Sequence, residues 1–270
     1  MKYFQHFNAA SVDDAIALLK KFNGTGKLNA GGTDLLGTLK GDILPAYPEA
    51  VINIKTIPNL DYIKASTRGI RIGALARLAD IVKSSEIRKN YGLLAEAAHT
   101  VANPNLRNMA TLGGNLAQDV RCWYYRYPEH VGGPIHCLRK GGEMCYAYEG
   151  QNQYHCIFGG DLCYIVHPSD TAPALAALGA VCRVSSPLSS RSVAVESFHV
   201  LPTEDPQRET VLAPDEILTE IVVPPPEAGL RSSYRKIRTR GAWDFAIAGA
   251  ALAIAFDGES VRSARVFLSG

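Results

Sequence analysis

The sequence predicts an α/β fold followed by a small α+β unit, and three observations carry this prediction. Short β-branched runs at residues 50–54 and 69–73 alternate with stretches whose apolar residues recur at helical spacing. Three consecutive prolines at 224–226, followed by Gly229, mark a linker. Beyond it, an apolar segment at 245–256 and the turn Asp257-Gly258 are typical of a β-hairpin.

The first hundred residues predict helices between short strands. Ser11 and Asp14 begin a helix whose apolar residues keep helical spacing until Gly24. Residues 27–30 form the next expected strand, and a helical turn follows at 35–39. Helices are expected at 77–84 and 92–101, and Asn103-Pro104-Asn105 breaks the second of them.

The second half predicts one further helix and several strands. The helix spans residues 171–178, with Pro173 in its first turn, where proline is tolerated. The expected strands lie at 181–184, 193–195, 217–223, 233–238 and 264–268. About forty residues after the linker are few for an independent core, so the last unit is expected to lean on the first part or to be a shortened form.

Composition and charge exclude several classes of function. The net charge of +2 over 270 residues argues against a nucleic-acid surface or a polybasic membrane patch. The N-terminus lacks the apolar core of a secretion signal and no run of eighteen apolar residues occurs, so we expect a cytoplasmic protein without membrane insertion. Rossmann, P-loop and α/β-hydrolase motifs are also missing.

Two Gly-Gly turns are the first candidate binding feature. Gly31-Gly32 is followed by Thr33-Asp34, and Gly113-Gly114 is preceded by Thr111 and followed by Asn115. A glycine turn that enters a helix exposes backbone N–H groups, which suit a phosphate. Each turn alone is more often plain backbone geometry, but together the two could clasp one diphosphate.

A cysteine-rich run is the second candidate feature. Cys122, Cys137, Cys145, Cys156 and Cys163 lie in this run, and only Cys182 lies outside it. In a reducing compartment such cysteines favour metal ligands, with free thiols and disulfides as alternatives. The run has no Cys-x-x-Cys pair, so an iron-sulfur cluster suits it at least as well as structural zinc.

The motifs, in their order along the chain, carry a family resemblance. They are Ala30-Gly31-Gly32-Thr33-Asp34-Leu35, Thr111-Leu112-Gly113-Gly114-Asn115-Leu116, Pro168-Ser169-Asp170 with Leu178-Gly179-Ala180, Glu216-Ile217-Leu218, and Lys236 ahead of Asp244-Phe245-Ala246. In this order the chain resembles the FAD-binding (medium) subunit of the xanthine dehydrogenase family of molybdenum hydroxylases, over nearly its whole length.

The resemblance implies a fold and a function. The implied fold is a two-subdomain FAD-binding domain of the PCMH or VAO-like type at residues 1–225, followed at 230–270 by a CO-dehydrogenase-flavoprotein-like C-terminal domain that we expect to be incomplete. The implied function is electron transfer as an oxidoreductase subunit, with the chemistry at molybdenum in a partner subunit and no catalytic residue in this chain. The implied partners are a molybdopterin-binding large subunit, a [2Fe-2S] small subunit and an external carrier, which is ferredoxin, NAD or a quinone.

The resemblance also implies which residues bind FAD. They are Leu28, Asn29, Ala30, Gly31, Gly32, Thr33, Asp34, Leu35, Val101, Thr111, Leu112, Gly113, Gly114, Asn115, Gln118, Asp170, Leu218 and Lys236.

An insert at about 119–165 departs from most family members, which run directly from the second turn to Ser169-Asp170. It resembles the insert of 4-hydroxybenzoyl-CoA reductase and of bacterial aldehyde oxidoreductases, whose FAD subunit carries an extra [4Fe-4S] cluster. The implied ligands are Cys122, Cys137, Cys145 and Cys163. Cys156 is the rival for the fourth place, and Cys182 lies too far along the chain.

Two other functions remain as alternatives to the electron-transfer subunit. A free-standing flavin oxidase would need a flavin-linking residue and a substrate domain, and neither is identified in the sequence. A structural zinc-binding assembly module would bind zinc and no yellow cofactor.

Overall fold

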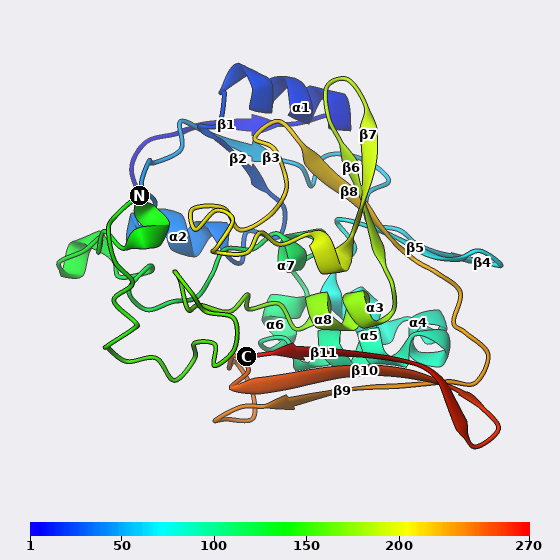
Figure 1. Ribbon diagram of the computed structural model, residues 1–270. Coiled ribbons are helices and arrows are strands. Elements are labelled where there is room, and N and C mark those ends of the chain that lie inside the picture. The colour runs from blue at the N-terminus through cyan, green and yellow to red at the C-terminus, as the bar shows by residue number, and fades with distance from the viewer.

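The computed structural model describes residues 1–270 and contains three sheets with helices between them (Figure 1). The first sheet is parallel, in the order β1-β3-β2, and is formed by β1 (Gln5–Asn8), β2 (Gly26–Asn29) and β3 (Ala50–Asn53). Helix α1 (Val12–Lys21) connects β1 to β2, and the Ser11 hydroxyl accepts a hydrogen bond from the Asp14 N–H, as the capping pattern predicts. Helix α2 (Leu35–Gly41) follows β2.

The second sheet is antiparallel, in the order β4-β5-β8-β6-β7. Its strands are β4 (Ile63–Ser66), β5 (Gly69–Gly73), β6 (Val181–Ser185), β7 (Ser190–Ala194) and β8 (Ile217–Val223). Strands β5 and β8 have the limits that the sequence predicts. The strand expected at 193–195 is wrong in its last residue, because Val195 begins the 3₁₀ helix η3 (Val195–Ser197).

The helical layer lies between the second and third sheets (Figure 1). It comprises α3 (Leu78–Lys83), α4 (Ser85–Asn90), α5 (Gly92–Thr100), α6 (Pro104–Arg107), α7 (Leu112–Leu116) and α8 (Thr171–Ala177). Asn103-Pro104 ends α5 as expected but also begins α6, because the Asn103 side chain caps the Leu106 N–H and Pro104 takes the first helical position. None of the helices is both long and apolar enough to cross a membrane.

The third sheet is antiparallel, in the order β11-β10-β9, and its strands are β9 (Leu230–Ile237), β10 (Ala248–Asp257) and β11 (Ser260–Ser269). One face packs on α5 and α8, so that Tyr234, Ala251 and Ala253 belong to the same buried core as the helices and the second sheet. The division of the chain near residues 225–230 stays a prediction.

The insert forms a long excursion of irregular chain, drawn in green in Figure 1. Its regular structure is limited to the 3₁₀ helices η1 (Glu129–Val131) and η2 (Leu138–Lys140) and an isolated bridge between His155 and Ile165. A separate small core holds it against the first part of the chain, and this core joins Ile43 to Val120, Cys122, Tyr125 and Cys137.

We expect the interior strand β5 to contribute strongly to stability. Ile72 is fully buried there, so Ile72→Ala should lower the free energy of unfolding by about 2–5 kcal/mol through lost burial and a residual cavity. The matched change Ile237→Ala, at a position 66% exposed, should shift it by less than about 0.5 kcal/mol. Urea unfolding of both variants measures the difference, and equal losses would contradict this assignment of the core.

Candidate functional site

A cavity of about 790 Å³ lies where the two glycine turns meet. Its lining comes from distant segments of the chain: the end of β2, the start of α7, the Asp170 turn, β8 and β9. The residues predicted to bind a flavin nucleotide that line it are Leu28, Asn29, Ala30, Gly31, Gly32, Thr33, Asp34, Leu35, Val101, Thr111, Gly113, Gly114, Asn115, Gln118, Asp170, Leu218 and Lys236. Leu112 does not line it, because its side chain is fully buried in the main core.

The first turn presents unpaired backbone donors to this cavity. The N–H groups of residues 31–35 make no hydrogen bond within the chain. Gly32 has a φ of +70°, which favours glycine, and the buried Oδ1 of Asn29 also lacks a partner. A run of unpaired N–H groups beside a left-handed residue forms a concavity suited to an anion such as phosphate.

The backbone of the first turn lies in close contact with the backbone of the segment before α7. A Cβ atom at Gly31 would lie 2.1 Å from the Met109 carbonyl oxygen, so no side chain fits there. A Cβ atom at Gly114 would lie 2.9 Å from Thr111 Oγ1 and 4.0 Å from the Ala30 Cβ. The two turns are therefore neighbours.

The second turn differs from the first because its N–H groups already have partners. Gly113 donates to the Ala74 carbonyl at 2.9 Å, and Gly114 donates to Thr111 Oγ1 at 3.1 Å. The Oδ1 of Asn115 accepts hydrogen bonds from the Ser169 and Thr171 hydroxyls, both at 2.6 Å. This turn therefore supplies a closely packed wall and fixes the Asp170 segment beside it.

Asp34 connects the first turn to the insert. Its carboxylate accepts the Asp119 N–H at 2.8 Å and pairs with Arg121 at 2.9 Å and with Arg126 at 2.7 Å. Burial lowers the pKa of Arg121 to about 10, against the opposing effect of Asp34. The side chain of Asp34 thus holds the beginning of the insert at the cavity edge.

A buried ion pair closes the other side of the cavity. Lys236 Nζ lies 2.7 Å from Asp170 Oδ2, and the side chains are only 3% and 6% exposed. The Tyr234 hydroxyl donates to Asp170 Oδ1 at 2.8 Å, and burial, followed by the Asp170 charge, raises the Tyr234 pKa. These contacts tie β9 to the start of α8.

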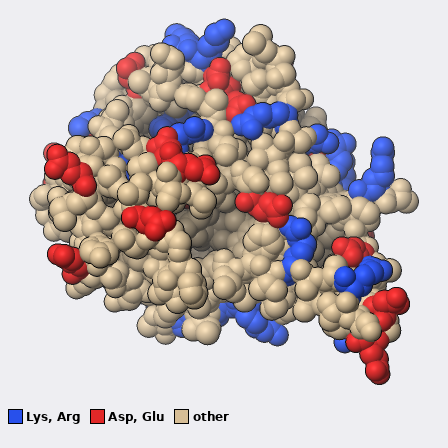
Figure 2. Space-filling model, in the orientation of Figure 1, with Lys and Arg blue, Asp and Glu red and all other residues tan.

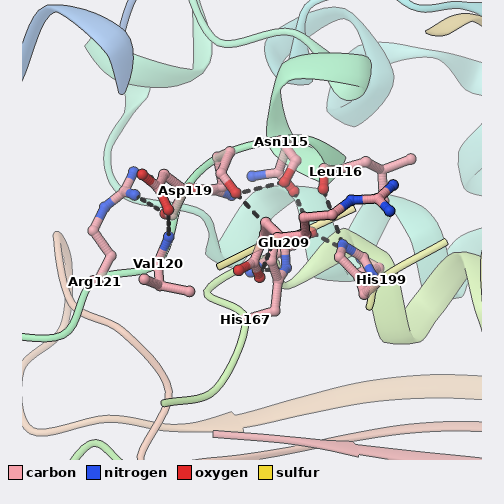
Figure 3. A network of polar contacts seen from close by, with 12 residues as sticks. Asn115, Leu116, Asp119, Val120, Arg121, His167, His199 and Glu209 are labelled. Carbon is pink, nitrogen blue, oxygen red and sulfur yellow. Dashed lines mark hydrogen bonds and ion pairs between the residues drawn. The ribbon is translucent and has the colours of Figure 1, made fainter. Parts of the chain in front are cut away.

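Two histidines with their rings in close, tilted contact lie beyond the end of α7 (Figure 3). The rings of His167 and His199 have centroids 4.0 Å apart, and their Nε2 atoms contact the Gln118 and Leu116 carbonyls at 3.2 and 3.0 Å. Burial lowers the pKa of both histidines, so they are neutral near pH 7. The 3.8 Å approach of His167 to Glu209 is therefore not an ion pair.

Sequence reasoning missed several residues of the cavity wall. The segment 44–48 and the side chains of Arg121, Tyr125, Trp243 and Phe245 also line it. Phe245 belonged to a quoted motif, and Arg121 follows the second turn closely, so both carried a signal. Trp243 carried none, because its place depends on the Trp243 N–H bond to the Ala102 carbonyl, far away in the sequence.

The four predicted metal ligands surround one small, mostly apolar cavity. Cys122, Cys137, Cys145 and Cys163 all line it. The rival Cys156 does not line it and instead lies beside Gly160 and Tyr164, while Cys182 is buried in β6 of the second sheet. No group of three or more potential ligands is drawn together tightly enough for a single metal ion.

Tyr125 and Arg139 form a wall shared by the two cavities, since each lines both of them. The Tyr125 hydroxyl donates to Asp119 Oδ2 at 2.7 Å, and Arg139 pairs with Glu209. The glycine-turn cavity and the cysteine cavity are therefore one side chain apart.

Polar side chains surround the cysteines as well. His155 Nε2 lies 3.4 Å from Cys122 Sγ, and burial lowers the pKa of His155. Lys140 Nζ lies 4.9 Å from the centroid of the Tyr125 ring, and burial lowers its pKa. Burial raises the pKa of the Cys122 thiol to about 11 and also raises that of Cys163.

Comparison with known proteins shows which family the chain matches. A family model described as the FAD binding domain in molybdopterin dehydrogenase matches residues 2–226. The chain is 34% identical over 273 residues to the aldehyde oxidoreductase FAD-binding subunit PaoB of Escherichia coli (strain K12), covering 100% of this chain and 82% of that protein. It is 28% identical over 267 residues to the carbon monoxide dehydrogenase medium chain of Hydrogenophaga pseudoflava, covering 98% and 74%.

Solved structures share the fold. A carbon monoxide dehydrogenase from Hydrogenophaga pseudoflava, which lacks the Mo-pyranopterin moiety of its molybdenum cofactor, matches 99% of this chain and 75% of its own with a TM-score of 0.73 and 27% identity. Quinoline 2-oxidoreductase from Pseudomonas putida 86 matches 100% and 75%, with a TM-score of 0.70 and 21% identity, and shows the fold alone. These matches confirm the predicted mixed α/β fold.

The burial of the cysteines predicts their order of reaction. In metal-free protein at pH 8, iodoacetamide should label the partly exposed Cys145 and Cys156 first. Cys122 should react slowly, because a pKa of about 11 leaves roughly one thiol in a thousand ionised. Peptide mass spectrometry measures the rates, and denaturant should make all six cysteines react alike. Equal rates for Cys122 and Cys145 in folded protein would contradict the buried cavity.

Proposed function

Because the chain belongs to the family of FAD-binding domains in molybdopterin dehydrogenases, we propose that it is the flavin-carrying electron-transfer subunit of a molybdenum hydroxylase and that it holds a [4Fe-4S] cluster as well. FAD binding and an oxidoreductase role follow from the family. The [4Fe-4S] cluster and the individual residues that bind each cofactor are our proposal. One observation carries the proposal: the segments predicted to bind FAD meet at one cavity, and the four predicted cysteines line a second cavity across a shared wall.

The residues of the first cavity fit FAD. The free N–H groups of residues 31–35 would hold the phosphates, and the unpaired Asn29 Oδ1 would accept a hydrogen bond from the nucleotide. Gly113 and Gly114 would let the nucleotide approach the second turn. Val101, Gln118, Leu218 and the Asp170–Lys236 pair would line the remainder.

The residues of the second cavity fit a cluster whose irons each take one cysteine. In a [4Fe-4S] cluster each thiolate binds a different iron, so the sulfurs surround a volume instead of meeting at a point. The placement of four cysteines around one mostly apolar cavity supports this proposal, and structural zinc is the alternative. Cys122, Cys137, Cys145 and Cys163 are the proposed ligands.

FAD exchanges electrons in pairs or singly, whereas a [4Fe-4S] cluster takes one at a time, and together they would link one-electron and two-electron partners. The chain would fix the two sites on either side of Tyr125 and Arg139. None of its residues is required as a nucleophile or general base in this proposal.

The proposed partners follow from the family. They are a molybdopterin-binding large subunit, a [2Fe-2S] small subunit and an external carrier, which is ferredoxin, NAD or a quinone. The proposed location is the cytoplasm. A free-standing flavin oxidase and a zinc-binding assembly module are the alternatives. Visible absorbance separates them, because the proposal requires a flavin band with a broad shoulder near about 400 nm that dithionite bleaches, as Fe–S clusters show.

The flavin site predicts the effect of filling the second turn. Gly114→Val should abolish FAD binding, because the new side chain occupies the space between Thr111, Ala30 and the cavity. Gly37→Val is the matched control, since a Cβ atom there meets nothing within 4 Å. Flavin content per chain, measured by absorbance after desalting, tests both. Full flavin in the Gly114 variant would place FAD elsewhere.

The cysteine cavity predicts a separation of the two cofactors. Cys145→Ser should remove most of the iron and leave FAD bound, because the two sites use different segments. Cys156→Ser should keep its iron, since Cys156 does not line the cavity. Iron and flavin assays on the same preparations decide the matter. Iron loss in the Cys156 variant but not in the Cys145 variant would contradict the proposed ligand set.

A further inference from the structure

Lys140 is a buried cation without an acidic partner. Its side chain is only 4% exposed, and its Nζ makes no hydrogen bond. The other basic residues of the insert are all paired, Arg121 and Arg126 with Asp34 and Arg139 with Glu209. A buried, unpaired ammonium is unfavourable, and its contact with the Tyr125 ring offsets only part of that cost.

The groups that face Lys140 indicate what would balance its charge. The Lys140 N–H donates to the Cys137 carbonyl at 2.8 Å, and the Lys140 Nζ lies over the Tyr125 ring, which packs in one small core with Cys122 and Cys137. The Asp119 carboxylate already accepts hydrogen bonds from the Tyr125 hydroxyl and the Val120 N–H. The unpaired ammonium thus lies over Tyr125, a ring that lines the cysteine cavity, and an anion held in that cavity would stabilise it.

The acidic residues of the insert do not supply that anion. Glu129, Glu143, Glu149 and Asp161 are all exposed, whereas the basic residues are turned inward. Figure 2 shows acidic side chains over the side of the molecule where Figure 1 places the insert. The insert therefore has a negative surface and a positive interior around its cysteines.

We infer that Lys140 is the countercharge of the centre held by these cysteines and raises its reduction potential. This inference rests on the proposed [4Fe-4S] cluster. Four thiolates make such a cluster anionic, and each added electron makes it more so. A fixed positive charge in a buried position near the cluster favours the form with the extra electron, so removal of the charge lowers the potential. Lys140 acts through the cluster and is not a catalytic residue.

The test is Lys140→Met in the full chain, loaded anaerobically with iron, sulfide and FAD. In a dithionite titration followed by EPR, the cluster of this variant should have a lower midpoint potential than that of the wild type at the same iron content. Lys64→Met is the matched control, because Lys64 also lies over a tyrosine ring, that of Tyr62 at 4.8 Å, but away from the cysteines. The control should match the wild type.

Thermal unfolding gives a second readout that a merely structural role would not produce. In iron-free protein, Lys140→Met should raise the melting temperature, because it removes an unpaired buried charge. Iron loading should then stabilise the variant less than it stabilises the wild type. An unchanged cluster potential at full iron content, or a less stable iron-free variant, overturns the inference. Wild-type protein that takes up FAD but no iron overturns the proposed cluster itself, and the role of Lys140 with it.

Discussion

The contact between Gly31 and the Met109 carbonyl is the constraint on which the site depends. No side chain larger than hydrogen fits between them, so the turn after the parallel sheet can touch the segment that enters α7. This contact lets residues far apart in sequence line the same cavity. It also fixes the first turn in a conformation in which its backbone N–H groups point away from other acceptors of the chain.

Asp34 extends this constraint to the insert. In sequence it is a polar residue after a glycine turn, and its carboxylate binds two arginines and one backbone N–H of the segment 119–126. The cysteine-bearing chain therefore begins at the rim of the first cavity. Its irregular path is stabilised by charge pairing and a small core of its own more than by regular secondary structure.

The sequence predicted what local pattern determines. Strands β5 and β8 are β-branched runs with glycine or proline at their ends, and their limits were predicted correctly. Strands β1 and β4 were not predicted, because Gln5–Asn8 and Ile63–Ser66 are short, polar and mostly exposed. The residues named from the motif order line the first cavity, apart from Leu112, which is buried in the main core, but the motifs did not identify the whole lining.

Charge pairing across the insert could not be predicted from the sequence. Arg121, Arg126, Arg139 and Lys140 look alike in composition, and only the folded chain shows that Lys140 lacks a carboxylate. The pairing of Arg139 with Glu209 spans about seventy residues, as its sequence separation shows.

Arg139 and Tyr125 line both cavities, so a change in either residue alters two sites at once. Under the proposed function, this wall would stand between the two redox centres. Arg121 lines the first cavity and Arg139 lines both, so positive charge of the insert lies where the proposal places the phosphates and the sulfurs.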